Sequence, residues 1–345
     1  MITTNLENEI LEKAIYAFRK NTGLLLEHVD QEHRVNAHAD NLLNLEIEGQ
    51  KTLYYADVKT HFNKANLTLH RIDNTQKPTD NPYLLVTRYV NAVLAAQLKE
   101  LEMQFIDTAG NAYIRQHNLF IMLTTNKPPE DTRPVQLNRA FKAAGLKLIF
   151  AFLCNPGLEN KPYREIAGAA NIALGTVGWI MNDLRDMGYM VDMGTKGHKL
   201  FDKEKLFKRW IVEYPERLRP KLVLGKYQGA PGWRENARIN PEHAQWGGEV
   251  AAANLTKYLK PQDLTLYTDP VKLNKILLDN RLGKDPKGHI EILERFWGID
   301  EDNQDKETVP VLLVYADLIA TGNQRNLEAA KKIYEQDIIQ LIRED

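Results

Sequence analysis

Residues 161–201 constrain the fold most, because two helix patterns and a hairpin pattern follow one another there without a long break. Pro162 opens a short first helix, since proline lacks the N–H that an initial helical turn leaves unpaired. Asn171 ends this helix, and a second one begins near Leu174. The apolar residues of the second helix recur every three or four positions, as on a buried helix face: Val177, Ile180, Met181, Leu184 and Met187.

A glycine and a hairpin follow the second helix. Gly188 is placed to cap its C-terminus, where a left-handed residue is favoured. Residues 189–193 and 198–201 predict two strands around the turn 194–197, which has a glycine at each end. Helix, tight turn, helix, glycine stop and basic hairpin together are typical of a winged helix-turn-helix, a DNA-binding module. The competing interpretation is a winged helix that contacts only other proteins.

The polar side of the second helix supplies the first candidate DNA contacts. In such a module, residues near the start of this helix meet base edges, while its flanks meet phosphates. We therefore expect Thr176, Trp179 and Asn182 in the major groove, where Asn182 can read an adenine edge. Gly178 completes the set on this helix. Its first turn carries no Arg or Lys, so a second copy of the chain, as a homodimer, would add affinity.

Positive charge concentrates on the same part of the chain. Residues 145–225 carry 13 Lys and Arg against 9 Asp and Glu, a net charge of +4. Residues 1–128 have a net charge of −2, and residues 226–345 have a net charge of −4. A basic region that coincides with a helix-turn-helix pattern favours nucleic acid as its partner. The hairpin contributes three residues that we expect on the DNA backbone: Lys196, His198 and Lys199.

A second candidate site lies in the N-terminal part, where strand and helix patterns alternate. Asp40 begins one expected strand, and Asp57 and Lys59 end the next, so a hairpin can bring both carboxylates to one end of a sheet. Two carboxylates can hold Mg²⁺, and a lysine beside them can orient a water molecule. This pattern resembles the PD-(D/E)xK restriction-endonuclease-like fold. The alternatives are a structural ion pair or an inherited nuclease fold without activity.

Asp107 precedes a Gly-Asn turn and either caps that turn or joins the carboxylates, capping being favoured.

The composition and the residue spacing also argue against several classes of protein. No apolar run reaches the length of a membrane span, and the N-terminus has no secretion signal. The single cysteine, Cys154, cannot form an internal disulfide and fits a reducing cytoplasm. The histidines lack metal-site spacing, so we expect no cofactor, apart from Mg²⁺ under the nuclease alternative.

Proline-rich and glycine-rich stretches divide the chain into three expected segments of a mixed α+β protein. The stretch 125–134 is rich in proline and charge, which predicts a linker. The stretch 229–240 contains Pro231-Gly232 and predicts a loop before the last segment. The expected domains are a restriction-endonuclease-like α/β domain, a winged helix-turn-helix domain and a C-terminal α/β domain: residues 1–128, 135–225 and 226–345.

Three stretches carry a family resemblance: residues 83–114, the winged-helix pattern, and WGGEVAA followed by VPVLLVYADLIATGNQRNLEAAKKIYE. Together they resemble the AbiEi-like antitoxins, transcriptional regulators of type IV toxin–antitoxin systems, in a variant with an endonuclease-like N-terminal domain. The resemblance implies a repressor that binds double-stranded operator DNA of its own operon through the winged helix. It also implies that the chain counteracts a nucleotidyltransferase-like toxin without a stable complex. The alternative function is a Mg²⁺-dependent DNA nuclease targeted by the winged helix.

Overall fold

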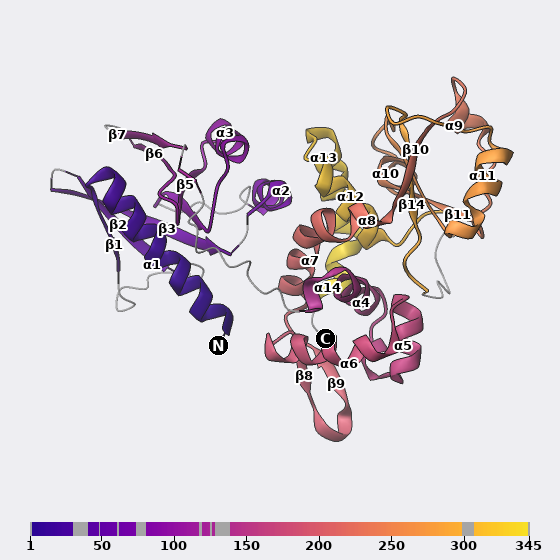
Figure 1. Cartoon of the computed structure of the whole chain (residues 1–345), viewed down its shortest axis with the longest axis horizontal. Helices are drawn as coiled ribbons and strands as arrows, with labels where there is room; N and C mark the ends of the chain where they lie inside the picture. The colour runs from indigo at the N-terminus through magenta and orange to yellow at the C-terminus, as the bar shows by residue number, and fades with distance from the viewer. Residues whose placement is uncertain are drawn as a thin grey trace. The chain divides into compact units, whose positions relative to one another are not determined.

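The computed structural model describes residues 2–29, 41–47, 49–60, 62–73, 81–116, 119–124, 126–127, 139–298 and 307–343. The chain forms two compact units, Met1–Gln136 and Leu137–Asp345, and the mixed α+β class is confirmed (Figure 1). Elements on both sides of residue 226 build the second unit. The separate domains 135–225 and 226–345 stay a prediction of the sequence. No helix among the described residues is long and apolar enough to span a bilayer.

The first unit is built on a seven-stranded sheet whose strands follow chain order from β1 to β7. The pairs among β1, β2 and β3 are antiparallel, β3, β4 and β5 run parallel, and β5, β6 and β7 are antiparallel again. The strands are β1 Leu25–His28, β2 Asn41–Ile47, β3 Gln50–Lys59, β4 Tyr83–Thr87, β5 Gln104–Asp107, β6 Ala112–Gln116 and β7 Leu119–Leu123.

Helices cover this sheet on both faces. The amphipathic helix α1 (Ile2–Thr22) buries Ile10, Ala14 and Phe18 in one core cluster, together with alternate residues of β2, β3 and β4. The helix α3 (Ala92–Glu100) contributes to a second core cluster. That cluster contains the strand residues between those of the first cluster, such as Leu85 of β4. Because strand side chains alternate between faces, the two clusters lie on opposite sides of the sheet.

The second unit begins with the short 3₁₀ helix η3 (Arg139–Phe141) and continues with helices that precede a small hairpin. These elements are α4 Ala143–Cys154, η4 Leu158–Asn160, α5 Tyr163–Ala170, α6 Leu174–Asp186, β8 Met190–Asp192, η5 Gly194–Lys196, β9 His198–Leu200, α7 Lys203–Arg217 and α8 Arg219–Leu222. Residues 162–201, called the helix–hairpin segment below, therefore contain the helices and the hairpin in the predicted order.

A five-stranded sheet, ordered β11-β12-β14-β10-β13, completes the second unit. Its strands are β10 Val223–Gln228, β11 Ala244–Gly247, β12 Leu264–Thr268, β13 Gly283–Lys284 and β14 Ile290–Glu294. The accompanying helices are α9 Trp233–Asn236, α10 Gly248–Thr256, η6 Pro270–Lys272, α11 Leu273–Asp279, α12 Val311–Thr321, α13 Gln324–Ile333, the π-turn Tyr334–Ile338 and α14 Ile339–Ile342. Strands β10 and β11 were not predicted, since neither shows a clear period-two pattern.

Aromatic side chains join the helices before the hairpin to the sheet that follows it. Trp210 of α7 stacks on Phe150 of α4 at a centroid distance of 5.6 Å and on Tyr214 at 4.8 Å. Phe150 also lies 5.0 Å from Phe296, just after β14. The indole N–H of Trp210 donates to the Leu146 carbonyl at 2.8 Å, so this buried aromatic group leaves no polar atom of Trp210 unpaired.

A buried polar cluster makes a second connection. The Asp317 carboxylate of α12 accepts a hydrogen bond from Arg219 Nε at 3.0 Å. It also accepts from the Tyr214 hydroxyl at 3.2 Å and from the Tyr267 hydroxyl at 2.9 Å. Arg219 Nη2 in turn donates to Glu291 Oε2 of β14 at 2.6 Å. Burial raises the pKa of the Asp317 carboxyl, and the Arg219 guanidinium opposes that rise.

Replacing Asp317 with Ala should strongly destabilise the second unit, because the half-buried Arg219 guanidinium would lose the more deeply buried of its two carboxylate partners. We expect the free energy of unfolding to fall by about 3–5 kcal/mol. All five tryptophans lie after residue 136, so tryptophan fluorescence during urea unfolding of the full chain reports on this unit alone.

Asp279→Ala is the matched control. Asp279 makes an exposed pair with Lys275 four residues earlier on α11, at 3.2 Å. Loss of such a pair should change stability by less than about 1 kcal/mol. Equal shifts of the unfolding midpoint in both variants would contradict a structural role for the buried cluster.

Candidate nucleic-acid interface

Local backbone signals fix the two helices of the helix–hairpin segment. Pro162 is the N-cap residue of α5, and Asn171 ends α5 in the left-handed conformation with φ 49°. Gly188, with φ 77°, follows α6, and the Tyr189 N–H donates to the Leu184 carbonyl at 2.8 Å. That bond is the one expected of a Schellman C-cap. The predicted opening at Pro162 and the stops at Asn171 and Gly188 are confirmed.

The outward side of α6 is defined by its buried stripe. Val177, Ile180, Met181 and Leu184 are buried, so residues about half a helical turn away from them face solvent. The residues on that opposite side recur at spacings of four and three: Gly175, Trp179, Asn182 and Asp186. Trp179 is 58% exposed. Among the predicted base-reading residues, Trp179 and Asn182 therefore share one outward face.

Thr176 and Gly178 lie on the two flanks of α6 and are half-buried. A Cβ on Gly178 would lie 3.3 Å from the Tyr163 ring of α5, so this glycine allows the two helices to approach closely. Gly178 therefore has a local packing reason for being glycine, apart from any contact with DNA.

An arginine from outside the helix–hairpin segment joins the outward face. The Arg139 guanidinium of η3 lies 4.4 Å from the centroid of the Trp179 ring, within the range of a cation–π interaction. The next residue, Ala140, donates its N–H to Asp183 Oδ2 at 3.2 Å, which ties η3 to α6. Arg139 is exposed and brings beside α6 the positive charge that the first turn of the helix lacks.

Asn182 is partly committed within its own helix. Arg185 Nη2 donates to Asn182 Oδ1, and Arg185 Nη1 lies 3.7 Å from Asp192 Oδ2 of the hairpin. The guanidinium therefore bridges α6 and β8 instead of pointing away from the protein. The Arg185 contact leaves the amide nitrogen of Asn182 and the second lone pair of its oxygen for another partner.

The hairpin is shorter than predicted. Strands β8 and β9 have three residues each, because Tyr189 takes part in the cap of α6 and residues 194–196 form a 3₁₀ turn. The Met193 N–H donates to the Gly197 carbonyl at 2.7 Å and closes this turn. Asn160 of η4 holds β9 from the side: His198 N–H donates to its Oδ1 at 2.6 Å, and its Nδ2 donates to the His198 carbonyl at 2.8 Å.

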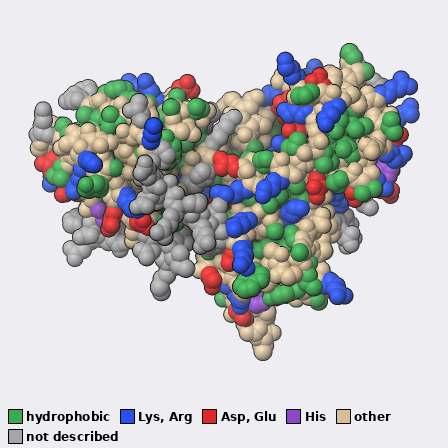
Figure 2. All heavy atoms as spheres, viewed as in Figure 1, with side chains coloured by type: hydrophobic (Ala, Val, Ile, Leu, Met, Phe, Trp, Pro, Cys, Tyr) green, Lys and Arg blue, Asp and Glu red, His purple; other side chains and the backbone are tan. Residues whose placement is uncertain are grey.

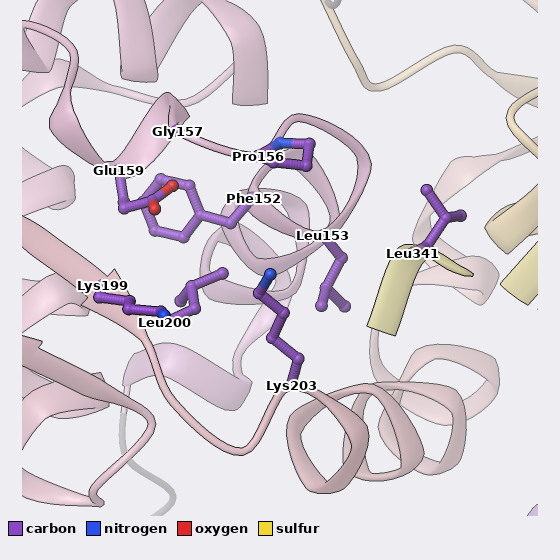
Figure 3. Close-up of a pocket in the computed structure, with 9 residues that line it drawn as sticks. All are labelled: Phe152, Leu153, Pro156, Gly157, Glu159, Lys199, Leu200, Lys203 and Leu341. Carbon is purple, nitrogen blue, oxygen red and sulfur yellow. The ribbon is translucent and has the colours of Figure 1, made fainter. Parts of the chain in front are cut away.

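The three predicted hairpin contacts lie at or beside the 3₁₀ turn. Lys196 ends η5, and its side chain is outside the described atoms. His198 is half-buried, and its Nδ1 atom has no hydrogen-bond partner among the described residues. Lys199 is exposed and also borders a pocket of about 80 Å³ at the base of the hairpin (Figure 3).

The same pocket is too small to hold a typical organic ligand. Figure 3 shows Lys203 pointing into it from the start of α7, between Phe152 and Leu153 of α4. Glu159 also borders it and has a buried Oε2 without a hydrogen-bond partner. Small-molecule sites occupy about 300–1,000 Å³. A pocket of about 80 Å³ therefore points away from an enzymatic cleft at this position.

In the first unit, the structure brings together two of the three predicted nuclease residues. Lys59 Nζ lies 2.9 Å from Asp57 Oδ1, and the Tyr83 hydroxyl donates to Asp57 Oδ2 at 3.0 Å. Asp40 lies outside the described residues. Both oxygens of Asp57 have protein partners, which agrees with a structural ion pair. Within the described part of the chain, no cluster of three His, Cys, Asp or Glu residues is arranged to hold a metal ion.

Asp107 caps the turn that follows β5. Its oxygens accept from the N–H groups of Val90, Ala109 and Asn111 at 2.8–2.9 Å, and from the Asn111 side-chain amide at 2.8 Å. Burial raises the pKa of the Asp107 carboxyl, and these hydrogen bonds oppose that rise. The favoured prediction of a cap is confirmed.

Comparison with known proteins gives one match. Residues 199–339 match the family model described as transcriptional regulator, AbiEi antitoxin, Type IV TA system. The match begins in β9 and covers α7, the five-stranded sheet and most of the closing helices. The predicted family resemblance is confirmed over these residues, and it implies a regulator or antitoxin of a toxin–antitoxin system. No curated protein and no solved structure matches the chain.

Two glycines of the candidate interface should respond to alanine with opposite signs. At Gly197, φ is 80° with ψ −147°, and a Cβ would lie 2.1 Å from Asn160 Oδ1. We expect Gly197→Ala to lower the free energy of unfolding by about 1–3 kcal/mol. At Gly175 a Cβ has nothing within 4 Å, and alanine favours a helix by up to about 1 kcal/mol.

Urea unfolding of both full-length variants, followed by tryptophan fluorescence, measures these changes. Gly175→Ala serves as the control for the loss of a glycine as such. A Gly197→Ala protein as stable as the parent would show that Asn160 and the 3₁₀ turn do not fix the hairpin.

Proposed function

We propose that this chain is a cytoplasmic, sequence-specific repressor that binds double-stranded DNA through the helix–hairpin segment, acting as a winged helix-turn-helix. The observation that carries the proposal is the regulator match, which starts in strand β9 of the hairpin that follows α6 and its exposed outward face. A regulator of its own operon needs a DNA-binding element, and α6 with the hairpin is the best-formed candidate among the described residues.

The proposed contacts follow from the places of the residues on η3, α6 and the hairpin. Trp179, Asn182 and the flanking Thr176 would enter the major groove, while Arg139 and the hairpin residues Lys196, His198 and Lys199 would lie along phosphates. Figure 2 shows further Lys and Arg side chains gathered over α7, next to the hairpin. This basic surface would attract the DNA backbone without reading its sequence.

The antitoxin role is the second part of the proposal. The regulator match supports an antitoxin role. We propose that the chain counteracts a nucleotidyltransferase-like toxin without binding it stably, as the family resemblance implies. Growth of cells that express such a toxin from the neighbouring gene should recover when this chain is co-expressed. Affinity purification of the chain from those cells should not retain the toxin.

A homodimer on a two-fold symmetric operator would supply two copies of α6.

Replacing Lys196 and Lys199 together with Ala should weaken binding to all DNA sequences by a similar factor. Each lost phosphate contact should reduce the slope of log affinity against log salt by about 0.9. Fluorescence anisotropy of a duplex from the region upstream of the gene, measured at several salt concentrations, gives both quantities.

Lys275→Ala with Lys287→Ala is the matched control, since it removes the same charge from exposed positions of the C-terminal sheet region. This control should leave the salt slope unchanged. If the hairpin variant and the control have the same affinity and slope, the hairpin does not contact DNA.

The nuclease alternative uses Asp40, Asp57 and Lys59 of the first unit and is tested separately. The contacts of Asp57 with Lys59 and Tyr83 favour the repressor over the enzyme. The repressor proposal predicts intact duplex DNA after incubation with the full chain and Mg²⁺. Cleavage that disappears in Asp57→Asn would instead establish the nuclease.

A further inference from the structure

We propose that α6 selects A·T base pairs by contacting thymine 5-methyl groups with the Trp179 indole. This inference rests on the proposed DNA binding and names the kind of sequence that the protein would read. It depends on three features of the outward face of α6. The face has no basic side chain, it exposes the Trp179 indole, and Arg139 packs against that indole.

The outward face lacks the donors that read guanine. The commonest specific contact to guanine is a bidentate Arg or Lys bond to its O6 and N7 atoms. Gly175, Trp179, Asn182 and Asp186 make up this face, and none of them is basic. Arg185, on the flank, is engaged by Asn182 and Asp192. The outward face of α6 therefore has no basic side chain for the bidentate contact to guanine, and Asp186, a possible acceptor for the cytosine amine, is the last residue of the helix.

Asn182 keeps part of its hydrogen-bonding capacity beside Arg185. Its oxygen accepts one hydrogen bond from Arg185, and an amide oxygen has a second lone pair. With that lone pair and its N–H₂ group, Asn182 can contact an adenine edge, which agrees with a preference for A·T pairs. Such a contact recognises adenine and leaves the thymine methyl group to another side chain.

Trp179 supplies the contact that can recognise the thymine 5-methyl group. Its ring is 58% exposed, and Leu174 on the neighbouring flank is 47% exposed. In the major groove, the thymine methyl is the apolar group that distinguishes an A·T pair from a G·C pair. Gly175 lies one turn before Trp179 on the same face, and no atom lies within 4 Å of the position that a Cβ would occupy. This open space lets a base edge approach the indole.

The indole is also held in place before DNA arrives. The Arg139 guanidinium covers one side of the ring at 4.4 Å, and the Ala140–Asp183 hydrogen bond ties η3 to α6. A ring that is already ordered loses less side-chain entropy on binding. Arg139 lies beside the ring on an exposed surface, where its charge can pair with a phosphate next to the contacted thymine.

Selection of tight binders from a pool of random duplexes, with the full-length protein, tests the inference. The enriched sequences should share thymines at fixed positions. Each of these is then replaced by deoxyuridine, which removes only the 5-methyl group. We expect the affinity to fall about fourfold for each contacted thymine, the worth of one buried methyl group.

Two variants assign the effect to a side chain. Trp179→Ala should bind thymine and uracil duplexes equally well. Asn182→Ala should bind both more weakly and keep the fourfold preference. The fluorescence of the four remaining tryptophans checks that Trp179→Ala is folded.

Three results would overturn the inference. The first is an equal preference for thymine in Trp179→Ala and in the parent, and the second is a shared site of G·C pairs without an effect of uracil. Both leave DNA binding itself intact. The third is an absence of salt-dependent binding to any duplex, which would overturn the proposed function as well and favour a protein-binding role for α6.

Discussion

The arrangement of the second unit depends on one buried carboxylate. Asp317 of α12 receives hydrogen bonds from α7, α8 and β12, and Arg219 extends the cluster to β14. Removing such charges from water costs about as much as their attraction returns, so the cluster contributes geometry more than net stability. Its directional bonds permit one mutual orientation of the helices and the sheet. The stacked rings of Trp210 and Phe150 then fill the space between the helices and the sheet with apolar side chains.

This junction lies within the part of the second unit that matches the regulator family, whereas the helix that we propose to read DNA lies outside it. Tyr214, Arg219, Tyr267, Glu291 and Asp317 all lie within the matched residues 199–339, whereas α6 lies before them. The scaffold that orients the hairpin base therefore belongs to the region with the regulator match. The outward side chains of α6 can differ between chains without disturbing Asp317 or its partners. The sequence selectivity that we propose for α6 is thus separable from the fold that presents this helix.

The sequence predicted what local chemistry controls. Pro162, Asn171 and Gly188 mark the ends of α5 and α6 because their backbone preferences act within a few residues. The sequence did not predict the contact of Arg139 with Trp179 or the hydrogen bonds of Asn160 with β9. In each pair the two residues are about forty positions apart and meet only through tertiary packing. The unpredicted strands β10 and β11 likewise depend on neighbours in the sheet. For the first unit, the Asp57–Lys59 pair was expected, whereas its Tyr83 partner comes from another strand.

The stack of Arg139 on Trp179 has a mechanical consequence. The second unit begins at Leu137, so Arg139 stands only two residues from the covalent connection to the first unit. A pull on the start of the second unit would therefore act on η3, and through Arg139 on the indole that we propose to touch thymine.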